Sequence, residues 1–176
     1  MTYFDFAFDY VVGNEGSYID DPMDSGGPTK YGVTLKSYSE YLKQDFTPVV
    51  IEELTLEQAK GFYLHQYWIP SNCCMMTDFG IATAIFDCSV LYGIGTAAGM
   101  AQRAVDTKVD NKIGPETVSI LNSFNRGIFI GKLIYELMQR IEKVIQINPE
   151  NEKFRMGWTN RAERLLVLNQ TTAFNI

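Results

Sequence analysis

The apolar residues of this chain recur at the spacing of an α-helix along almost its whole length. Residues 3–14 carry a broad apolar stripe at this spacing, and residues 79–91 are apolar on nearly every side, which is typical of a buried central helix. A buried helix must be covered by other helices. Two starts of such helices can be recognised, the capping box Thr55–Gln58 and Pro115. Because 46% of the 176 residues are hydrophobic, a sizeable core is available. We therefore expect a mainly α fold.

The spacing of the apolar residues also predicts where the helices lie in the sequence. Helices are predicted over residues 3–14, 35–42, 56–67, 79–91, 96–105, 115–122, 128–146 and 160–168. Evidence for strands is weak, with Val49–Ile51 the main candidate and a short hairpin near Tyr31–Thr34 the other. Residues 16–32 are rich in Gly, Pro, Asp and Ser, which predicts a loop.

Charge and cysteine content limit the classes of function. The net charge of −6 and the pI near 4.8 make general binding of nucleic acid improbable, because phosphate contacts need clustered cations. Residues 111–176, however, carry 9 basic and 6 acidic side chains, so attraction to an anionic partner is expected there. The three cysteines, Cys73, Cys74 and Cys88, do not form an even disulfide framework and indicate folding in a reducing compartment.

The sequence shows no conventional signal for membrane insertion or export. No stretch reaches the ~18 apolar residues of a membrane span, so stable membrane insertion is not expected. The N-terminal segment has no basic region and carries Asp5 and Asp9, unlike a conventional signal peptide. A protein made in the cytoplasm that acts outside it would then need a holin or a dedicated secretion system.

Glu15 is the leading candidate for a catalytic group. If the first helix reaches it, the 100° step per residue places Glu15 about 20° from the apolar stripe. Partial burial and the negative pole of the helix both favour a protonated carboxyl, the state that a general acid needs. The alternative is that Glu15 lies in solvent at a frayed helix end.

The loop after Glu15 offers further polar groups. Asp24 follows with eight residues between, and glycosidic hydrolysis commonly uses a second carboxylate beside the acid. Tyr18 and Tyr31 bring flat apolar faces for sugar rings and hydroxyls for their edges. The alternative is that Asp20, Asp21 and Asp24 only form turns.

One motif in this region is dense and in register over about twenty residues. It comprises Asn14-Glu-Gly-Ser-Tyr18, Asp21-Pro22, Asp24, Gly26-Gly27, Thr29 and Tyr31-Gly-Val-Thr34. It resembles the signature of glycoside hydrolase family 108, which are N-acetylmuramidases with a lysozyme-like helical fold. The resemblance implies that Glu15 is the catalytic acid, while Ser17 stands where the family has Gly. The Glu-Asp-Thr spacing is also similar to that of phage-type lysozymes, which place the Thr one residue later, and this similarity implies that Thr29 is a water-positioning hydroxyl.

The second half of the chain is similar to the peptidoglycan-binding region that accompanies this family. The matching residues are Phe86-Asp87, Leu91-Tyr-Gly93, Gln102, Asp110-Asn-Lys-Ile-Gly-Pro-Glu-Thr117 and Gly157-Trp-Thr-Asn-Arg161. This implies a role for Asp87 in binding substrate, although Leu91 and Asn111 depart from the family's pattern. The alternative for Asp110–Thr117 is a tight turn followed by a Pro-started helix. We expect a single compact unit, with a catalytic region over 1–80 and a peptidoglycan-binding-like region over 81–170.

Several other side chains have two interpretations each. Tyr67, Trp68 and Trp158 could stack on saccharide rings, although an aromatic residue in a small helical protein commonly packs in the core. His65, the single histidine, is expected to be an ordinary helix residue. Lys153, Arg155, Arg161 and Arg164 form a basic cluster that either faces solvent or contacts anionic wall polymer.

Cofactor patterns are weak. His65 and the cysteines lack the spacing of a zinc site, the acidic loop lacks the order of an EF-hand, and Gly93–Gly99 only faintly matches a dinucleotide-binding turn. No cofactor or metal is therefore expected.

The sequence predicts a peptidoglycan hydrolase that cleaves the β-1,4 bond between N-acetylmuramic acid and N-acetylglucosamine. The predicted catalytic residues are Glu15 and Asp24, and the predicted substrate contacts are Tyr18, Thr29, Tyr31, Tyr67, Trp68 and Asp87. Its partner would be the glycan strand of the cell wall. Two alternatives are a lytic transglycosylase that uses the same Glu and a wall-binding or regulatory module without turnover.

Overall fold

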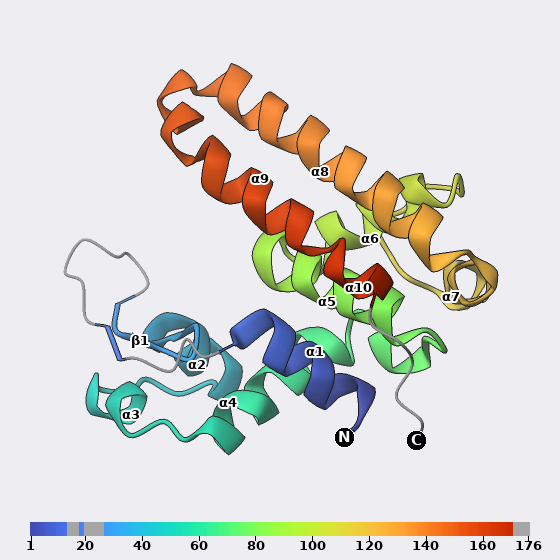
Figure 1. Cartoon of the computed structure of the whole chain (residues 1–176). Helices are drawn as coiled ribbons and strands as arrows, with labels where there is room; N and C mark the ends of the chain where they lie inside the picture. The colour runs from blue at the N-terminus through green and yellow to red at the C-terminus, as the bar shows by residue number, and fades with distance from the viewer. Residues whose placement is uncertain (14–17, 20–26, 171–176) are drawn as a thin grey trace. The chain divides into compact units, whose positions relative to one another are not determined.

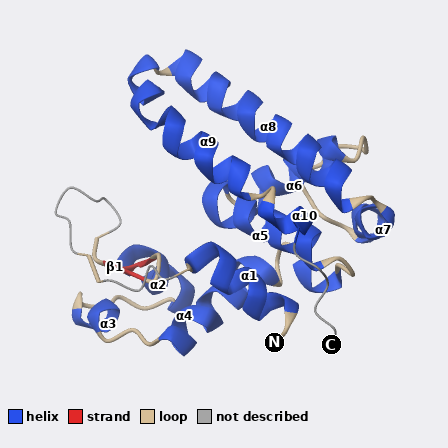
Figure 2. Cartoon of the chain, viewed as in Figure 1, coloured by secondary structure: helices blue, strands red, loops and turns tan. Residues whose placement is uncertain are grey.

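The computed structural model describes residues 1–13, 18–19 and 27–170, and most of them are helical (Figure 1, Figure 2). The mainly α fold predicted from the sequence is confirmed. The chain divides after Pro70 into two compact units, Met1–Pro70 and Ser71–Ile176. This division falls ten residues before the expected one, and the catalytic and wall-binding roles of the two parts stay predictions.

The first unit combines short helices with one small hairpin. Its described elements are α1 (Tyr3–Val12), β1 (Thr29–Lys30), β2 (Val33–Thr34), α2 (Leu35–Leu42), α3 (Val49–Glu52), α4 (Leu56–Tyr63) and the π-helical turn η1 (Leu64–Trp68). Side chains start three of these helices: Thr2, Thr34 and Thr55 each accept a hydrogen bond from the backbone N–H three residues on, and in each case the residue there bonds back. These are capping boxes, which satisfy otherwise unpaired amide groups at a helix start.

The hairpin was predicted near Tyr31–Thr34 and is observed there. Thr29 pairs with Thr34 and Lys30 with Val33, so the turn has two residues. Tyr31 and Gly32 both have positive φ, 53° and 73°, as a two-residue type I′ turn requires. The Tyr63 hydroxyl of α4 donates to the carbonyl oxygen of Tyr31 at 3.1 Å, which fixes the turn against the core.

Aromatic rings fill the core of this unit. The Tyr63 ring lies edge-on to Phe8 of α1 at 5.6 Å and to Phe62 at 5.5 Å between centroids. Lys60 of α4 pairs with Asp5 of α1 at 3.3 Å and lies 5.6 Å from the centre of the Phe8 ring. Helix α4 therefore holds both α1 and the hairpin turn, and these two elements flank the segments that carry Glu15 and Asp24.

Gly32 is the position in this hairpin least able to accept a side chain. An added Cβ would lie 2.5 Å from the Tyr63 hydroxyl, and the φ of +73° is itself unfavourable for other residues. We expect Gly32→Ala to lower the free energy of unfolding by about 2 kcal/mol. Gly61→Ala is the matched control, since a Cβ there meets nothing within 4 Å in helix α4, and it should stabilise by about 0.5–1 kcal/mol. Urea denaturation of both variants measures the change in the free energy of unfolding. Equal changes in the two variants would contradict the prediction that the hairpin turn requires glycine at position 32.

The second unit is built around one buried helix. Its described elements are η2 (Cys73–Met75), α5 (Phe79–Tyr92), α6 (Ile94–Ala104), α7 (Pro115–Ser123), α8 (Arg126–Ile147), η3 (Pro149–Phe154), α9 (Arg155–Arg164) and α10 (Val167–Gln170). Every residue of α5 from Phe79 to Ser89 is buried, as the sequence predicted. Helices α6, α8 and α10 pack against it, and α9 runs beside α8 (Figure 1).

Arg126 joins three helices of this unit. Its guanidinium donates to both carboxylate oxygens of Asp78 at 2.8 and 2.9 Å, and also to the carbonyl oxygen of Leu168. Asp78 in turn accepts from the backbone N–H of Ile81 and caps α5. The starts of α5 and α8 are thereby held together with α10.

Three elements of the structure differ from those predicted from the sequence. Val49–Ile51 is wrong as a strand, because it lies in the helical turn α3: Pro48 has a helical φ of −49° before it, and only Ile51 is buried. The first helix ends at Val12, two residues early, since Gly13 caps it with a φ of 54°. The last predicted helix begins earlier, at Arg155, and is interrupted after Arg164.

Candidate active site

The first helix ends before it reaches the leading catalytic candidate. The backbone N–H of Gly13 donates to the carbonyl oxygen of Asp9 at 2.9 Å and closes α1 at Val12. The helical register that related Glu15 to the apolar stripe therefore does not extend to it. Glu15 and Asp24 both lie outside the described residues, so their catalytic roles stay predictions.

The described residues around these two segments are joined by an isolated β-bridge. Ile19 and Thr29 exchange two backbone hydrogen bonds, at 2.9 and 2.8 Å. Thr29 also pairs with Thr34 of β2, so Ile19 lies along the opposite edge of β1. In the chain, Glu15 lies between Gly13 and Tyr18, and Asp24 lies between the two bridge residues. The segment that carries Glu15 therefore ends next to this bridge, and the segment that carries Asp24 begins at it.

The hairpin side chains expected to contact substrate are only partly exposed. The Thr29 hydroxyl donates to the carbonyl oxygen of Gly27 at 3.2 Å. Tyr31 is half-buried, with the Lys30 ammonium 5.6 Å from its ring centre, while Tyr18 is 37% exposed. The Lys30 ammonium also donates to the carbonyl oxygen of Glu52, which holds this side chain against α3.

Tyr67 and Trp68 lie in the π-helical turn η1, which the sequence pattern did not predict. Tyr67 is half-buried beside the rings of Tyr63 and Phe62, and burial raises its pKa. Trp68 is 4% exposed and packs on Phe4 at 5.6 Å. These contacts are those of core residues. A contact of either ring with substrate stays a prediction. His65 of the same turn is exposed.

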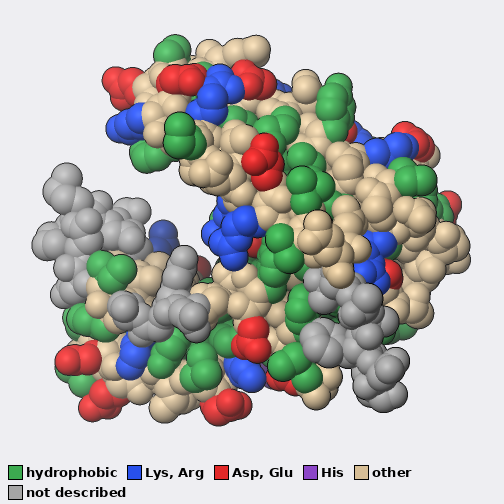
Figure 3. All heavy atoms as spheres, in the orientation of Figure 1, with side chains coloured by type: hydrophobic (Ala, Val, Ile, Leu, Met, Phe, Trp, Pro, Cys, Tyr) green, Lys and Arg blue, Asp and Glu red, His purple; other side chains and the backbone are tan. Residues whose placement is uncertain are grey.

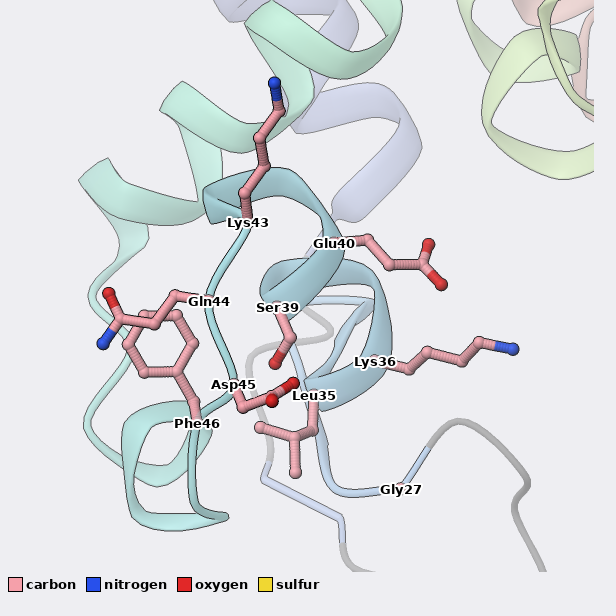
Figure 4. A pocket seen from close by; sticks show the side chains of 9 residues that line it. All are labelled: Gly27, Leu35, Lys36, Ser39, Glu40, Lys43, Gln44, Asp45 and Phe46. Carbon is pink, nitrogen blue, oxygen red and sulfur yellow. The ribbon is translucent and has the colours of Figure 1, made fainter.

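A pocket of the first unit lies beside the hairpin and has a volume of about 630 Å³. Its walls are Gly27, Leu35, Lys36, Ser39, Glu40, Lys43, Gln44, Asp45 and Phe46. Figure 4 shows Ser39 and Leu35 projecting from α2 toward the Gln44–Phe46 segment, whereas Lys36 and Glu40 extend away from it. Sequence reasoning missed this pocket, because its two walls show no motif and meet only in the fold.

Asp87 belongs to the second unit, where it forms a buried ion pair. Its Oδ1 accepts from Nη2 of Arg161 at 3.0 Å, and the two side chains are 6% and 34% exposed. Burial raises the pKa of the Asp87 carboxyl, and the Arg161 charge opposes that rise. The pair joins α5 to α9, and a contact of Asp87 with substrate stays a prediction.

The motif Asp110–Thr117 is held by one buried amide. Gln102 is 1% exposed, and its side-chain NH₂ donates to Asp110 Oδ1 at 2.7 Å and to the Lys112 carbonyl at 2.9 Å. Its oxygen accepts from the backbone N–H groups of Asp110 and Asn111. Asn111 has a φ of 62°, a conformation that Asn tolerates nearly as well as the Gly of the family's pattern. The motif therefore has a structural role, as a turn before the Pro115 helix start.

We expect Gln102→Leu to lower the free energy of unfolding by about 2–3 kcal/mol, because it removes the hydrogen bonds that shape the turn. Gln146→Leu, on an exposed position of α8, is the control and should change stability by less than about 0.5 kcal/mol. Thermal denaturation measures the loss of stability, and a sacculus pull-down well below the melting temperature measures binding. Together they separate a structural role of the motif from a role in ligand recognition. Lost binding with unchanged stability would instead assign the motif to ligand recognition.

Two of the four side chains of the basic cluster, Arg155 and Arg161, form ion pairs. Arg155 pairs with Glu142 and with Glu152, the latter at 2.6 Å, and Arg161 pairs with Asp87. Figure 3 shows acidic and basic side chains mixed at the turn between α8 and α9. Charge reversal at Arg155 would therefore break ion pairs before it weakened any contact with a wall polymer.

The described ranges also bear on two other classes of protein, those that hold a metal ion and those that span a membrane. There, no group of three or more His, Cys, Asp or Glu side chains is placed to hold a metal ion. Cys73 and Cys88 are buried and Cys74 is exposed. The same residues include no helix that is both long and apolar enough to cross a membrane.

Comparison with known families decides the class. Residues 8–93, which reach from α1 to the end of α5, match the model of glycosyl hydrolase 108. This segment belongs to glycosyl hydrolase family 108. The match includes Glu15, Asp24 and the hairpin, so the resemblance noted in the sequence is confirmed over this range.

A solved structure extends the likeness to the whole chain. SagA of Brucella abortus superposes with a TM-score of 0.79, covering 97% of this chain and 98% of SagA, at 26% identity. Among curated proteins, none matches the sequence. The match of residues 8–93 supports a glycoside hydrolase, and the activity that this family implies is hydrolysis of peptidoglycan.

Proposed function

We propose that the protein is an N-acetylmuramidase that hydrolyses the β-1,4 bond between N-acetylmuramic acid and N-acetylglucosamine. The family match over residues 8–93 carries this proposal, because it spans the whole motif around Glu15. In the proposed reaction Glu15 protonates the oxygen of the leaving sugar. Asp24, or a neighbouring group of its loop, positions the attacking water or stabilises the oxocarbenium-like transition state.

The contacts of the first unit support a site at the hairpin. The Ile19–Thr29 bridge ties the start of the segment that carries Asp24 to the hairpin, and the Tyr63 hydroxyl ties the hairpin turn to α4. General acid catalysis depends on a fixed distance between the acid and the leaving oxygen. A hairpin that is fixed against the aromatic core can hold the catalytic acid at a constant position.

The pocket beside the hairpin is proposed to take part of the glycan strand. Its volume of about 630 Å³ suits an oligosaccharide segment, and the side chains of Ser39, Gln44 and Asp45 offer hydrogen bonds to sugar hydroxyls. Phe46 adds an apolar face for the ring. Tyr18, Thr29 and Tyr31 are proposed substrate contacts on the hairpin side. The reaction needs no cofactor, and we place it at the cell wall, with export through a holin or a secretion system.

Analysis of the products tests the proposal. Purified sacculi digested with the protein should yield fragments with reducing N-acetylmuramic acid ends, identified by mass spectrometry after borohydride reduction. Fragments ending in 1,6-anhydro-N-acetylmuramic acid would assign a lytic transglycosylase. Bound but undigested sacculi would assign a wall-binding module and exclude both enzymes.

A further inference from the structure

The second unit contains a pocket that the proposed hydrolysis does not use. It has a volume of about 330 Å³ and lies between the end of α5, the middle of α8 and α9. Its described walls are Leu91, Tyr92, Arg140, Ile141, Val144, Trp158 and Arg161. Two of these side chains are cationic, none is acidic, and the remainder are aliphatic or aromatic.

Each of the two guanidinium groups contacts a neighbouring side chain. Arg140 lies over the ring of Tyr92, 5.1 Å from its centre. Arg161 is held by its bond to the buried Asp87. A cation fixed before binding loses less conformational entropy when it meets an anion.

Both cations also have hydrogen-bonding capacity that the described protein does not use. The Nε–H of Arg161 is buried and has no acceptor among the described residues. Arg140 takes part in none of the ion pairs formed by those residues. Around the pocket, Asp87 balances only one of the two charges, so the lining has a net positive charge in a protein that is acidic as a whole.

We propose that this pocket binds a short acidic peptide that carries free carboxylates and small apolar side chains. Guanidinium groups pair with carboxylates through two parallel hydrogen bonds. The aliphatic wall of Leu91, Ile141 and Val144 accepts methyl groups, and the Trp158 ring offers a flat apolar face. A neutral sugar would leave the charge of Arg140 unbalanced and the Arg161 Nε–H without a charged acceptor.

This chemistry is that of the stem peptides of peptidoglycan, which contain alanine and free carboxylates. The identification of the peptide as a wall stem rests on the proposed function. The second unit would then recognise the peptide part of the same polymer whose glycan strand the first unit cleaves.

Calorimetric titration of the full chain with a soluble stem tripeptide tests the pocket. Arg140→Gln should weaken binding by about tenfold or more, because a charge-assisted hydrogen bond is lost. Lys143→Gln is the matched control: it removes one exposed charge from the same helix without lining the pocket, and it should change the affinity by less than about twofold. The same tripeptide with its carboxylates amidated should not bind. Equal binding of both peptides, equal effects of both variants, or no binding by the wild type would overturn the proposal.

A second assay separates this proposal from the proposed function. Glycan strands freed of their stems by an amidase offer the glycosidic bond without any peptide. Wild-type protein that cleaves these strands but ignores the tripeptide refutes the peptide site and keeps the hydrolase. Protein that binds the tripeptide through Arg140 but leaves the strands intact supports the site and refutes the hydrolase.

Discussion

Replacing Glu15 by Gln should reduce the hydrolysis of sacculi by at least about a thousandfold, because the amide cannot donate the proton that the leaving sugar oxygen needs. The side chain keeps its size and shape, so the melting temperature and binding to sacculi should stay as in the wild type. Clearing of a sacculus suspension, with quantification of reducing ends, measures the loss. Asp24→Asn should cost about a hundredfold or more if this carboxylate positions water or stabilises the transition state.

Glu53→Gln provides the control for this experiment. Glu53 is an exposed carboxylate of the same unit and follows α3, and its change to Gln should leave the rate within about twofold. Wild-type activity in Glu15→Gln would show that another group protonates the leaving oxygen. Loss of activity in Glu15→Gln together with loss of the folded state would instead give Glu15 a structural role.

Much of the fold could be predicted because local chemistry determines it. Thr34 and Thr55 begin their helices as capping boxes, Pro115 begins α7, and the continuous apolar run of α5 is buried as expected. The hairpin near Tyr31 was also predictable from its Gly32. The motif around Glu15 identified the family from sequence alone, because that motif is local and dense.

The remaining features depend on contacts that sequence pattern does not encode. Gly13 is a recognisable helix stop after the last apolar residue of α1, yet Gly16 competes with it in the sequence. The β-branched Val49–Ile51 segment has strand propensity but forms one helical turn, because packing of Ile51 overrides local preference. The ion pair of Asp87 joins residues 74 positions apart, and no spacing rule relates them.

Loss of the Asp87–Arg161 pair should lower the stability of the fold more than loss of any other polar contact in the described part of the second unit. We expect Arg161→Leu to lower the free energy of unfolding by about 3 kcal/mol at neutral pH, because it leaves a buried carboxylate without a partner. Asp87→Leu should cost less, since Arg161 is one-third exposed and its charge can turn toward water. The double variant should recover part of the loss, because two apolar side chains replace the pair. Urea denaturation of the four proteins gives the coupling energy.

The pH dependence distinguishes this structural role from a contact with substrate. Burial already raises the pKa of Asp87 above its ordinary value of 3.8, and Arg161 opposes the rise. In Arg161→Leu the folded-state pKa should therefore rise further. A carboxyl with a raised folded-state pKa stabilises the fold at low pH, and this contribution is lost as the pH increases through that pKa. The penalty of Arg161→Leu should consequently be small near about pH 4 and grow toward about pH 7, whereas Asp87→Leu removes this dependence altogether. If Asp87 instead contacts the glycan, Asp87→Leu would keep wild-type stability at every pH and lose only activity, because an exposed substrate contact has no buried charge to compensate.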